Sequence, residues 1–366
     1  MPRIQPDIET FAKIKVIGVG NSGTNSINHM VRSRMRAVEF IAIDTDAQKL
    51  HYSLAPKKIH IGKGITRGLG GGMNPEIGRQ AAEETKEQIQ EALKGADMVF
   101  ITCGFGGATG TGAAPIIAQL AKEQDILTVA VVTKPFSFEG MQRARIAEEG
   151  LVELREAVDA MITIPNDRIF SVIDKNTTFS EAFKKCDDVL KQAVEGISDL
   201  ITMPGIINVD FADVKTVMKD AGSALMGIGF ATGEKRAEEA AKMAINSPLL
   251  DISIEGARGV LFAISGGEDM TMAEIQEAAA IITDSIDSEA KVIFGAINDD
   301  RLKKNQIKIT VIASGFQGER RQAKNSLFSA AYGTERGSMK EDSTAPEPEE
   351  EKSEWDSMPA FLRRRK

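Results

Sequence analysis

The glycine-rich segment at residues 104–115 is the part of the sequence best suited to hold a ligand. It reads Gly-Phe-Gly-Gly-Ala-Thr-Gly-Thr-Gly-Ala-Ala-Pro, and it lies between an apolar strand at 97–102 and a helical run at 116–122. The N–H groups of such a loop and of the following helical turn converge on one point, and small residues let a ligand come close. Thr109 and Thr111 add hydroxyl donors. The segment therefore predicts a cradle for phosphate oxygens, and because it lacks a Gly-Lys-Ser/Thr ending it is not a Walker loop.

A second glycine motif gives a competing prediction. Residues 18–23, Gly-Val-Gly-Asn-Ser-Gly, match G-x-G-x-x-G between a strand and a helix, and Asp44 ends the next strand. This pattern is typical of a dinucleotide-binding fold, in which the acid binds the ribose. An NAD-type Rossmann oxidoreductase is therefore an alternative. Against it, residues 68–72 form a third glycine loop, which suits a triphosphate enclosed from several sides, and no His or Cys is placed for hydride chemistry.

The elements around these loops predict an α/β fold. Strands at 14–20, 39–44, 58–61, 97–102, 127–133 and 160–164 alternate with helices at 25–36, 75–94, 116–122 and 141–158. Such alternation predicts a doubly wound, mainly parallel sheet with helices on both faces. Ligands of these folds bind beyond the carboxyl ends of the strands, where all three glycine loops lie.

One long helix should connect this domain to a second, smaller one. Residues 178–201 carry apolar side chains every three or four positions, and Thr178 and Glu181 form a capping box at the start. A helix of about 24 residues spans about 36 Å, enough to bridge two domains. Beyond it, strands at 260–265, 290–297 and 307–314 and a helix at 272–286 predict an α/β domain with a mixed sheet.

The predicted domain organisation follows from these boundaries. It comprises an N-terminal extension (1–12), a nucleotide-binding domain (13–177), the connecting helix (178–201), a loop and helix (202–221), the second domain (222–317), a disordered linker (318–352) and a C-terminal peptide (353–366). The linker is charged and rich in small residues, so it cannot bury a core. The peptide contains the single Trp, an apolar cluster and a basic end, and we expect it to fold on a partner. The alternative is a plain solubilising tail.

Composition narrows the classes of function. The net charge of -8 argues against non-specific binding of the whole body to nucleic acid or to an anionic membrane. The two Cys residues are typical of a reducing compartment, and the three His residues have no metal-ligand spacing. No stretch approaches the roughly 20 apolar residues of a membrane span. We therefore expect a soluble, intracellular protein with no resident metal.

The signature loop resembles that of the tubulin/FtsZ superfamily, and residues 11–316 with the terminal peptide resemble the FtsZ family. Three features depart from the family pattern: Asp44 stands in place of the usual Asn, Ala108 in place of Gly, and Asn21-Ser22 in place of a glycine pair. The matching segments, in order, are 21–25, 44–48, 66–70, 104–112, 134–140, 164–168 and 208–213.

The resemblance implies a GTP site with roles for particular residues. Glu139 and Arg143 would lie near the ribose and phosphates, Asn166 and Asp187 would bind the base, and Phe183 would stack on it. GTP or GDP would be the cofactor, with Mg²⁺ bound mainly through the nucleotide. The predicted phosphate-binding residues are Gly20, Asn21, Ser22, Gly23, Thr24, Asn25, Gly71, Gly72, Gly106, Gly107, Ala108, Thr109, Gly110 and Thr111.

Elementary chemistry supports guanine over adenine. Phe183 and Asp187 are four residues apart on the long helix and share a face. A ring can cover the purine there while the carboxylate accepts from guanine N1–H and the 2-amino group. Adenine presents an acceptor at N1 and has no 2-amino group, so the buried carboxylate would stay unpaired. The alternative is that Asp187 is the solvated edge of a helix.

The resemblance also implies catalysis between subunits. Asn208, Asp210 and Asp213 follow the long helix, far from Phe183, so they could act only on the nucleotide of a head-to-tail neighbour. Asp210 and Asp213 could orient a water or a cation for attack on the γ-phosphate. Asp210 could equally serve as a helix N-cap.

The resemblance implies a function as well. We expect a self-polymerising GTPase of the cell-division ring, cytoplasmic and assembling at mid-cell beneath the membrane. Residues Trp355–Lys366 would bind membrane tethers and regulators, with at most weak lipid contact through the basic end. A slow or inactive GTP-binding structural polymer remains an alternative because of Ala108 and Asn21-Ser22.

Overall fold

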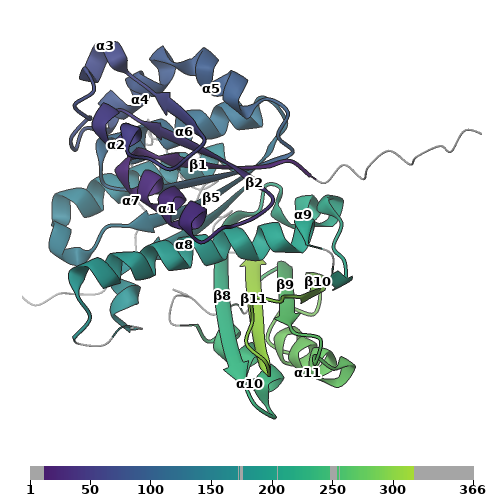
Figure 1. The fold of residues 1–366 in the computed structure, drawn as a ribbon. Coiled ribbons are helices and arrows are strands. Elements are labelled where there is room, and N and C mark those ends of the chain that lie inside the picture. The colour runs from purple at the N-terminus through teal and green to yellow at the C-terminus, as the bar shows by residue number, and fades with distance from the viewer. Residues whose placement is uncertain are drawn as a thin grey trace, which may run out of the picture. The chain divides into compact units, whose positions relative to one another are not determined.

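The computed structural model describes residues 12–316 except 172, 174–175, 204, 248–253 and 255. In the N-terminal part, strands alternate with helices (Figure 1). The order is β1 (Ile14–Val19), α1 (Gly20–Arg32), β2 (Val38–Asp44), α2 (Ala47–His51), β3 (Lys57–His60), α3 (Lys63–Thr66), α4 (Pro75–Glu84), α5 (Lys86–Leu93), β4 (Met98–Gly104), α6 (Ala108–Lys122), β5 (Leu127–Lys134), the 3-10 turn Ser137–Glu139, α7 (Met141–Ala157), β6 (Ala160–Pro165) and the 3-10 helix Asn166–Ser171.

The rest of the described chain begins with the predicted long helix. It comprises α8 (Phe179–Thr202), β7 (Gly205–Ile207), α9 (Phe211–Met218), β8 (Gly222–Thr232), α10 (Arg236–Ile245), β9 (Gly259–Gly266), α11 (Met272–Thr283), β10 (Lys291–Asn298) and β11 (Gln306–Ser314). The capping box of Thr178 and Glu181 is present at the start of α8, as predicted.

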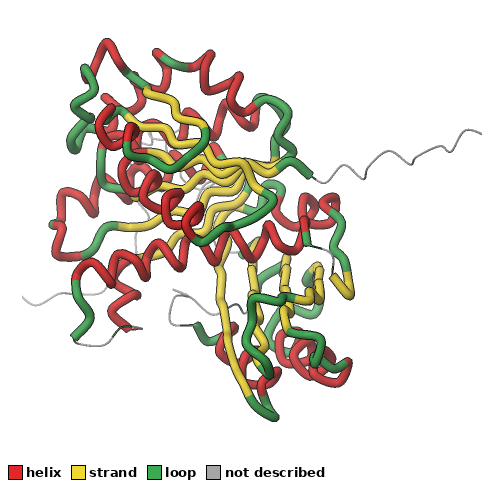
Figure 2. Tube along the Cα trace, viewed as in Figure 1, coloured by secondary structure: helices red, strands yellow, loops and turns green. Residues whose placement is uncertain are grey.

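The strands form one 11-stranded sheet (Figure 2). Its order is β3-β2-β1-β4-β5-β6-β8-β11-β9-β10-β7, and every pairing from β3 to β8 is parallel. β11 then pairs antiparallel with both β8 and β9, β9 pairs parallel with β10, and β7 pairs antiparallel with β10. The predicted parallel sheet and mixed sheet are therefore joined edge to edge through β6 and β8.

Helices cover both faces of the parallel strands, as a doubly wound fold requires. On one face, α1 and α8 pack on side chains such as Val16, Val131 and Ile162. On the other face, α4 to α7 pack on the alternate side chains of the same strands. The apolar side of α8 also contacts Leu261 and Ile312 of β9 and β11, whose opposite face is covered by α10 and α11. The predicted fold class is confirmed, and α8 is the helix shared by both parts.

Several predicted boundaries were wrong. Helices α1 and α6 begin inside the glycine loops, at Gly20 and Ala108, rather than at 25 and 116. The predicted helix at 75–94 is divided at Thr85 into α4 and α5. Five elements were not predicted from the sequence: α2, α3, β7, β8 and α10. Glycine has a low helix and strand propensity, so tertiary packing rather than residue type decided the starts of α1 and α6 and the strand β8. This reason does not apply to α10, which contains no glycine and consists largely of helix-forming residues.

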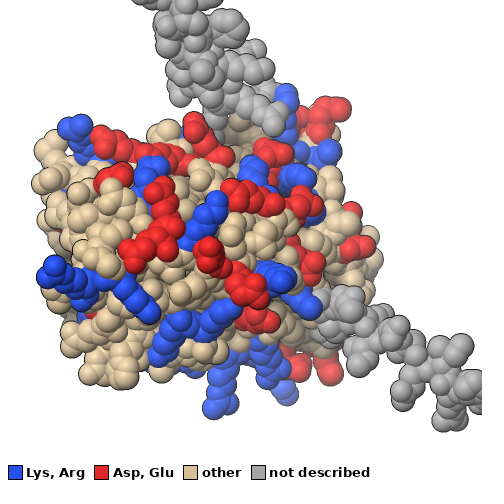
Figure 3. Space-filling view, turned by 90° about the horizontal axis from the view of Figure 1, so that it is seen from above, with Lys and Arg blue, Asp and Glu red and all other residues tan. Residues whose placement is uncertain are grey.

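The predictions for the tail and for most of the N-terminal extension lie outside the described residues. Among those described, no helix is long and apolar enough to cross a membrane. On the face drawn in Figure 3, acidic and basic side chains are interspersed over the surface.

Candidate functional site: a nucleotide pocket

A cavity of about 500 Å³ lies beyond the carboxyl ends of the parallel strands. It is lined by the ends of β1, β2, β4 and β5, the first turns of α1 and α6, the loop at 70–72 and the first half of α8. This is where a doubly wound fold places its ligand. Of the predicted site residues, those lining the cavity are Gly20, Asn21, Ser22, Asn25, Gly72, Gly107, Ala108, Thr109, Gly110, Glu139, Arg143, Asn166, Phe183 and Asp187.

One end of the pocket is built to bind an anion. The first turns of α1 and α6 both line it, and neither helix has a side-chain N-cap or an acidic residue in its first turn. The N–H of Ala108 donates to the carbonyl oxygen of Gly72 at 3.0 Å, and the remaining N–H groups of these first turns, with the positive dipole ends, are available to phosphate oxygens. Gly20 brings the two loops together, since it has φ +70° and a Cβ there would lie 3.2 Å from the nitrogen of Gly110. Thr109 is fixed by a 2.7 Å hydrogen bond between its Oγ1 and that of Thr45.

The other predicted phosphate residues support the cradle rather than line it. Gly23 lets α1 approach β4, because a Cβ there would lie 2.3 Å from the carbonyl oxygen of Thr102. The Thr111 hydroxyl accepts a 3.0 Å hydrogen bond from the N–H of Gly106, which fixes the loop. Gly71 faces Ala108, whose methyl would be 2.6 Å from a Cβ at 71. Thr24 is buried in α1, and its hydroxyl has no hydrogen-bond partner in the part of the chain that the structure describes.

The opposite end of the pocket carries the predicted base-binding groups. Asp187 accepts a 2.7 Å hydrogen bond from Ser26 Oγ, and burial raises the pKa of its carboxyl. Asn166 is buried, and its Oδ1 has no hydrogen-bond partner among the described residues. Phe183 is 38% exposed and its ring packs on Phe179 and Phe136. A flat apolar surface beside a carboxylate and an unsatisfied amide suits a purine base.

Between the two ends lie Glu139 and Arg143. Arg143 Nη1 donates to Glu139 Oε2 at 2.5 Å, and Glu139 Oε1 accepts from the backbone N–H of Phe136 at 2.9 Å. Glu139 is therefore held by the protein, and it in turn orients Arg143 at the pocket wall.

Several lining residues were not predicted individually from the sequence. The most informative is Asp44, which was considered as the ribose acid of the dinucleotide alternative and as a departure from the family pattern, but not as part of the GTP pocket. Thr133 lies near the end of β5 at the pocket, and the others lie within segments that were predicted to form the site: Val19, Thr45, Asp46, Gly70, Gly104, Phe105 and Pro135.

The acidic residues predicted to be catalytic do not line this pocket. Asn208 Oδ1 accepts from the N–H of Gly205 at 2.7 Å, and Asp210 is the N-cap of α9, accepting from the N–H of Ala212 at 3.2 Å. Asp213 is exposed in the first turn of α9. They follow the C-terminal end of α8, whereas Phe183 and Asp187 lie near its N-terminal end. The 15 residues from Asp187 to Thr202 span roughly 22 Å of helix.

The fold and the pocket together define an α/β protein of the nucleotide-binding class, with two helix N-termini lining the pocket. The chain belongs to the tubulin/FtsZ family: the family model "Tubulin/FtsZ family, GTPase domain" matches residues 13–174, and "FtsZ family, C-terminal domain" matches residues 222–317. The chain thus contains the GTPase domain of this family and binds guanine nucleotide. The dinucleotide alternative was wrong, because the G-x-G-x-x-G segment is one of several loops of a GTPase pocket.

Solved structures agree with this assignment. Two FtsZ structures from M. jannaschii, one titled as an empty dimer and one of a variant, are each 47% identical with a TM-score of 0.80. Their alignments cover 84% of this chain and 89% or 92% of theirs. CetZ2 from Haloferax volcanii, titled as a GTPγS-bound protofilament, has a TM-score of 0.72 at 22% identity over 87% of this chain and 99% of its own, which shows the shared fold.

Proposed function

We propose that this protein polymerises head to tail and that GTP bound by one subunit is hydrolysed with the help of Asn208, Asp210 and Asp213 of the next. The observation that carries the proposal is the separation of two sites by α8. The nucleotide pocket contains Asp187, and the exposed carboxylates of α9 follow the far end of the same helix. A rigid helix prevents them from meeting within one chain, whereas a repeated head-to-tail contact brings them together.

The pocket favours GTP over ATP. Asp187 offers a carboxylate to the two donors of the guanine edge, and Asn166 adds an unsatisfied polar atom beside it. Ser26 holds the carboxylate in place through its 2.7 Å hydrogen bond. Phe183 would cover the face of the base. An adenine in the same place would give the carboxylate no donor besides Ser26, at a cost of about 1–3 kcal/mol relative to guanine.

Mg²⁺ is expected to enter with the nucleotide. Of the charged side chains that line the pocket, Arg143 is the cation, and it is paired with Glu139. A triphosphate there needs more positive charge than the helix ends and one arginine supply. Mg²⁺ provides it while taking most of its ligands from phosphate oxygens and water.

The division-ring role is part of the same proposal. The protein would be cytoplasmic and would assemble at the mid-cell division site, with residues Trp355–Lys366 binding membrane tethers and regulatory division proteins. The acidic overall charge of -8 supports protein partners rather than nucleic acid. Contact with the membrane would be indirect or weak.

Sedimentation and phosphate release across a protein concentration series test the proposal. With GTP and Mg²⁺, we expect pelleted polymer above a threshold concentration, and phosphate release per protein that rises at the same threshold. ATP at the same concentration is the matched control. Polymer without release would favour a slow structural polymer. A rate of phosphate release that is proportional to protein concentration over the whole series, with no threshold, would contradict the shared active site.

A further inference from the structure

Asp44 is a buried carboxyl group at the phosphate end of the pocket, and one of its oxygens has no partner among the described residues. It ends β2, its residue is 2% exposed, and it lines the cavity together with Gly20 and Thr109. Its Oδ1 accepts a 3.2 Å hydrogen bond from the N–H of Asp46. Its Oδ2 is buried, and no group in the described part of the chain hydrogen-bonds to it. A buried oxygen left free in this way is costly unless a ligand or a proton satisfies it.

The charged groups around Asp44 do not neutralise it. Asp46 uses its carboxylate as the N-cap of α2, accepting from Gln48 and Lys49 at 2.9 and 3.0 Å. His60 of β3 faces it and favours the ionised form, but the Nε2 of that ring contacts the carbonyl oxygen of Thr45. The neighbouring ends of β1 and α6 contribute glycines and threonines to the lining, and Arg143 is paired with Glu139. Burial therefore dominates and raises the pKa of Asp44 to about 6.

A bound phosphate would add negative charge beside this carboxylate. We propose that Asp44 takes up a proton from solvent when nucleotide binds, and that the resulting carboxylic acid donates a hydrogen bond from Oδ2 to a phosphate oxygen. The proposal rests on the proposed guanine-nucleotide site and adds to it a proton that enters with the ligand. It turns a repulsive pair of anions into a charge-assisted hydrogen bond, which is among the stronger hydrogen bonds in proteins.

Nucleotide affinity should then depend on pH with a defined sign. Below pH 6, Asp44 is protonated with or without ligand and affinity is flat. Above pH 6, the free protein must acquire a proton to bind, so Kd rises by about tenfold per pH unit until the pKa of the complex is reached. Asp44→Asn removes the titrating group while keeping the shape of the side chain. We expect the variant to bind more tightly than the wild type at pH 8 and to show a flatter profile.

Calorimetry of a non-hydrolysable GTP analogue binding to the full chain tests this. Titrations at pH 7 in buffers of different ionisation enthalpy count the protons taken up. The terminal phosphate also titrates near neutral pH, so the readout is the difference between the wild type and Asp44→Asn. We expect the wild type to take up close to one proton more. Glu83→Gln is the matched control, since it removes one negative charge at an exposed position of α4 that does not line the pocket, and it should leave the count unchanged.

Three results would overturn the inference while leaving the nucleotide site intact. The first is equal proton uptake by the wild type and Asp44→Asn, and the second is parallel pH profiles of Kd for these two proteins. The third is proton uptake by the wild type that is seen in EDTA but disappears in Mg²⁺, which would place the metal at Oδ2. If Asp44→Asn does not fold, infrared difference spectra of the wild type must still show a new carboxylic C=O band when the analogue binds, and its absence overturns the proposal. Absence of any binding in the wild type would instead refute the proposed function.

Discussion

At the scale of single residues, Asp187 is the group on which base selectivity should depend. We expect Asp187→Ala to weaken GTP binding by about 1–3 kcal/mol, roughly 5- to 150-fold, and not to weaken ATP binding, because only guanine donates to the lost carboxylate. Competition binding with the two nucleotides measures the ratio. Asp188→Ala is the matched control, since that carboxylate binds His29 at 2.7 Å and does not line the pocket. An undiminished GTP preference in Asp187→Ala would contradict the assignment.

The sequence predicted many of the residues that meet in the pocket but not how each of them acts. Phe183 and Asp187 could be placed together because helical spacing is regular. By contrast, Thr111 was predicted to contact the phosphates, whereas its hydroxyl accepts a hydrogen bond from the backbone N–H of Gly106 in the loop. Asp44 was weighed as a ribose acid and as a departure from the family pattern, but its raised pKa was not predicted, because its burial depends on β1 and β3 packing on either side of β2. Such effects arise from chain segments that the local sequence does not contain.

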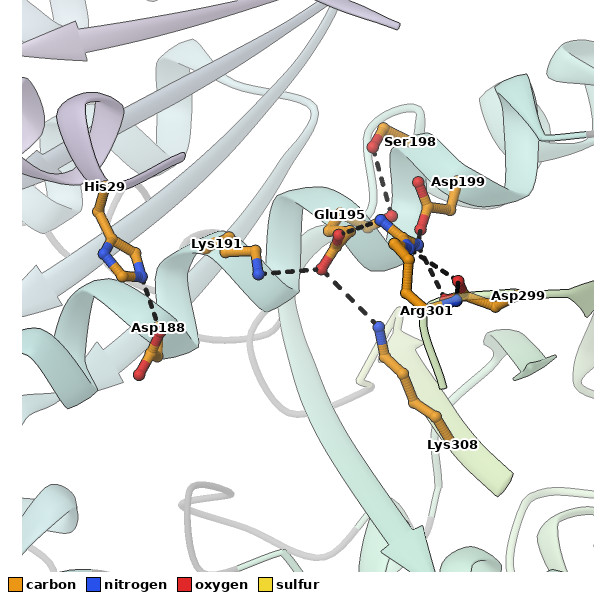
Figure 4. A network of polar contacts seen from close by, with 9 residues as sticks. All are labelled: His29, Asp188, Lys191, Glu195, Ser198, Asp199, Asp299, Arg301 and Lys308. Atoms are coloured by element: carbon orange, nitrogen blue, oxygen red, sulfur yellow. Dashed lines mark hydrogen bonds and ion pairs between the residues drawn. The ribbon is translucent and has the colours of Figure 1, made fainter. Parts of the chain in front are cut away.

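At the scale of elements, α8 is tied to the C-terminal strands by a network of charges (Figure 4). Arg301 donates to Glu195 Oε1 and Asp199 Oδ2 of α8, both at 2.6 Å, and to Asp299 Oδ1 at 2.7 Å. Lys191 and Lys308 lie 3.7 and 4.0 Å from Glu195 Oε2. The three carboxylate side chains are at most 13% exposed. Arg301 therefore neutralises buried acids and fixes α8 against the sheet that carries β10 and β11.

Loss of this arginine should destabilise the fold. We expect Arg301→Met to lower the free energy of unfolding by about 2–4 kcal/mol, because it leaves buried carboxylates with weaker partners, while the 44% exposure of the arginine side chain limits the loss. Urea unfolding followed by circular dichroism measures it. Lys303→Met, at an exposed position nearby, should change stability by less than about 0.5 kcal/mol. Equal stability of the two variants would show that the network contributes little.

Strand β8 shows why some elements could not be predicted. Its sequence, Gly-Ser-Ala-Leu-Met-Gly-Ile-Gly-Phe-Ala-Thr, is rich in glycine, which is unfavourable in strands. The structure explains one of these glycines: a Cβ at Gly229 would lie 1.9 Å from the carbonyl oxygen of Ala240 in α10. Small residues on both elements let the helix lie against the strand. By contrast, the capping boxes of α8 and α11 are local, and the former was predicted correctly.

At the scale of the whole molecule, the continuous sheet and α8 separate nucleotide binding from the exposed acids of α9. Neither site contacts the other within the described chain, and both are joined to one helix. In the proposed head-to-tail filament, a subunit would therefore carry half of each of two active sites. GTP hydrolysis should therefore require assembly. A single variant cannot show that the two halves come from different subunits, so two variants must be mixed.

Mixing two inactive variants tests this arrangement. Asp213→Ala should bind GTP and assemble but lose turnover, because its acidic loop no longer orients the attacking water. Ser22→Tyr should fill the phosphate end of the pocket from the first turn of α1 and lose nucleotide binding. In a mixed filament, the intact pocket of an Asp213→Ala subunit meets the intact loop of a Ser22→Tyr subunit. We therefore expect phosphate release from the mixture although each variant alone gives none. A mixture that co-sediments with GTP yet stays inactive would place catalysis within the single chain, since both halves of the proposed site would then be present at the contact without effect.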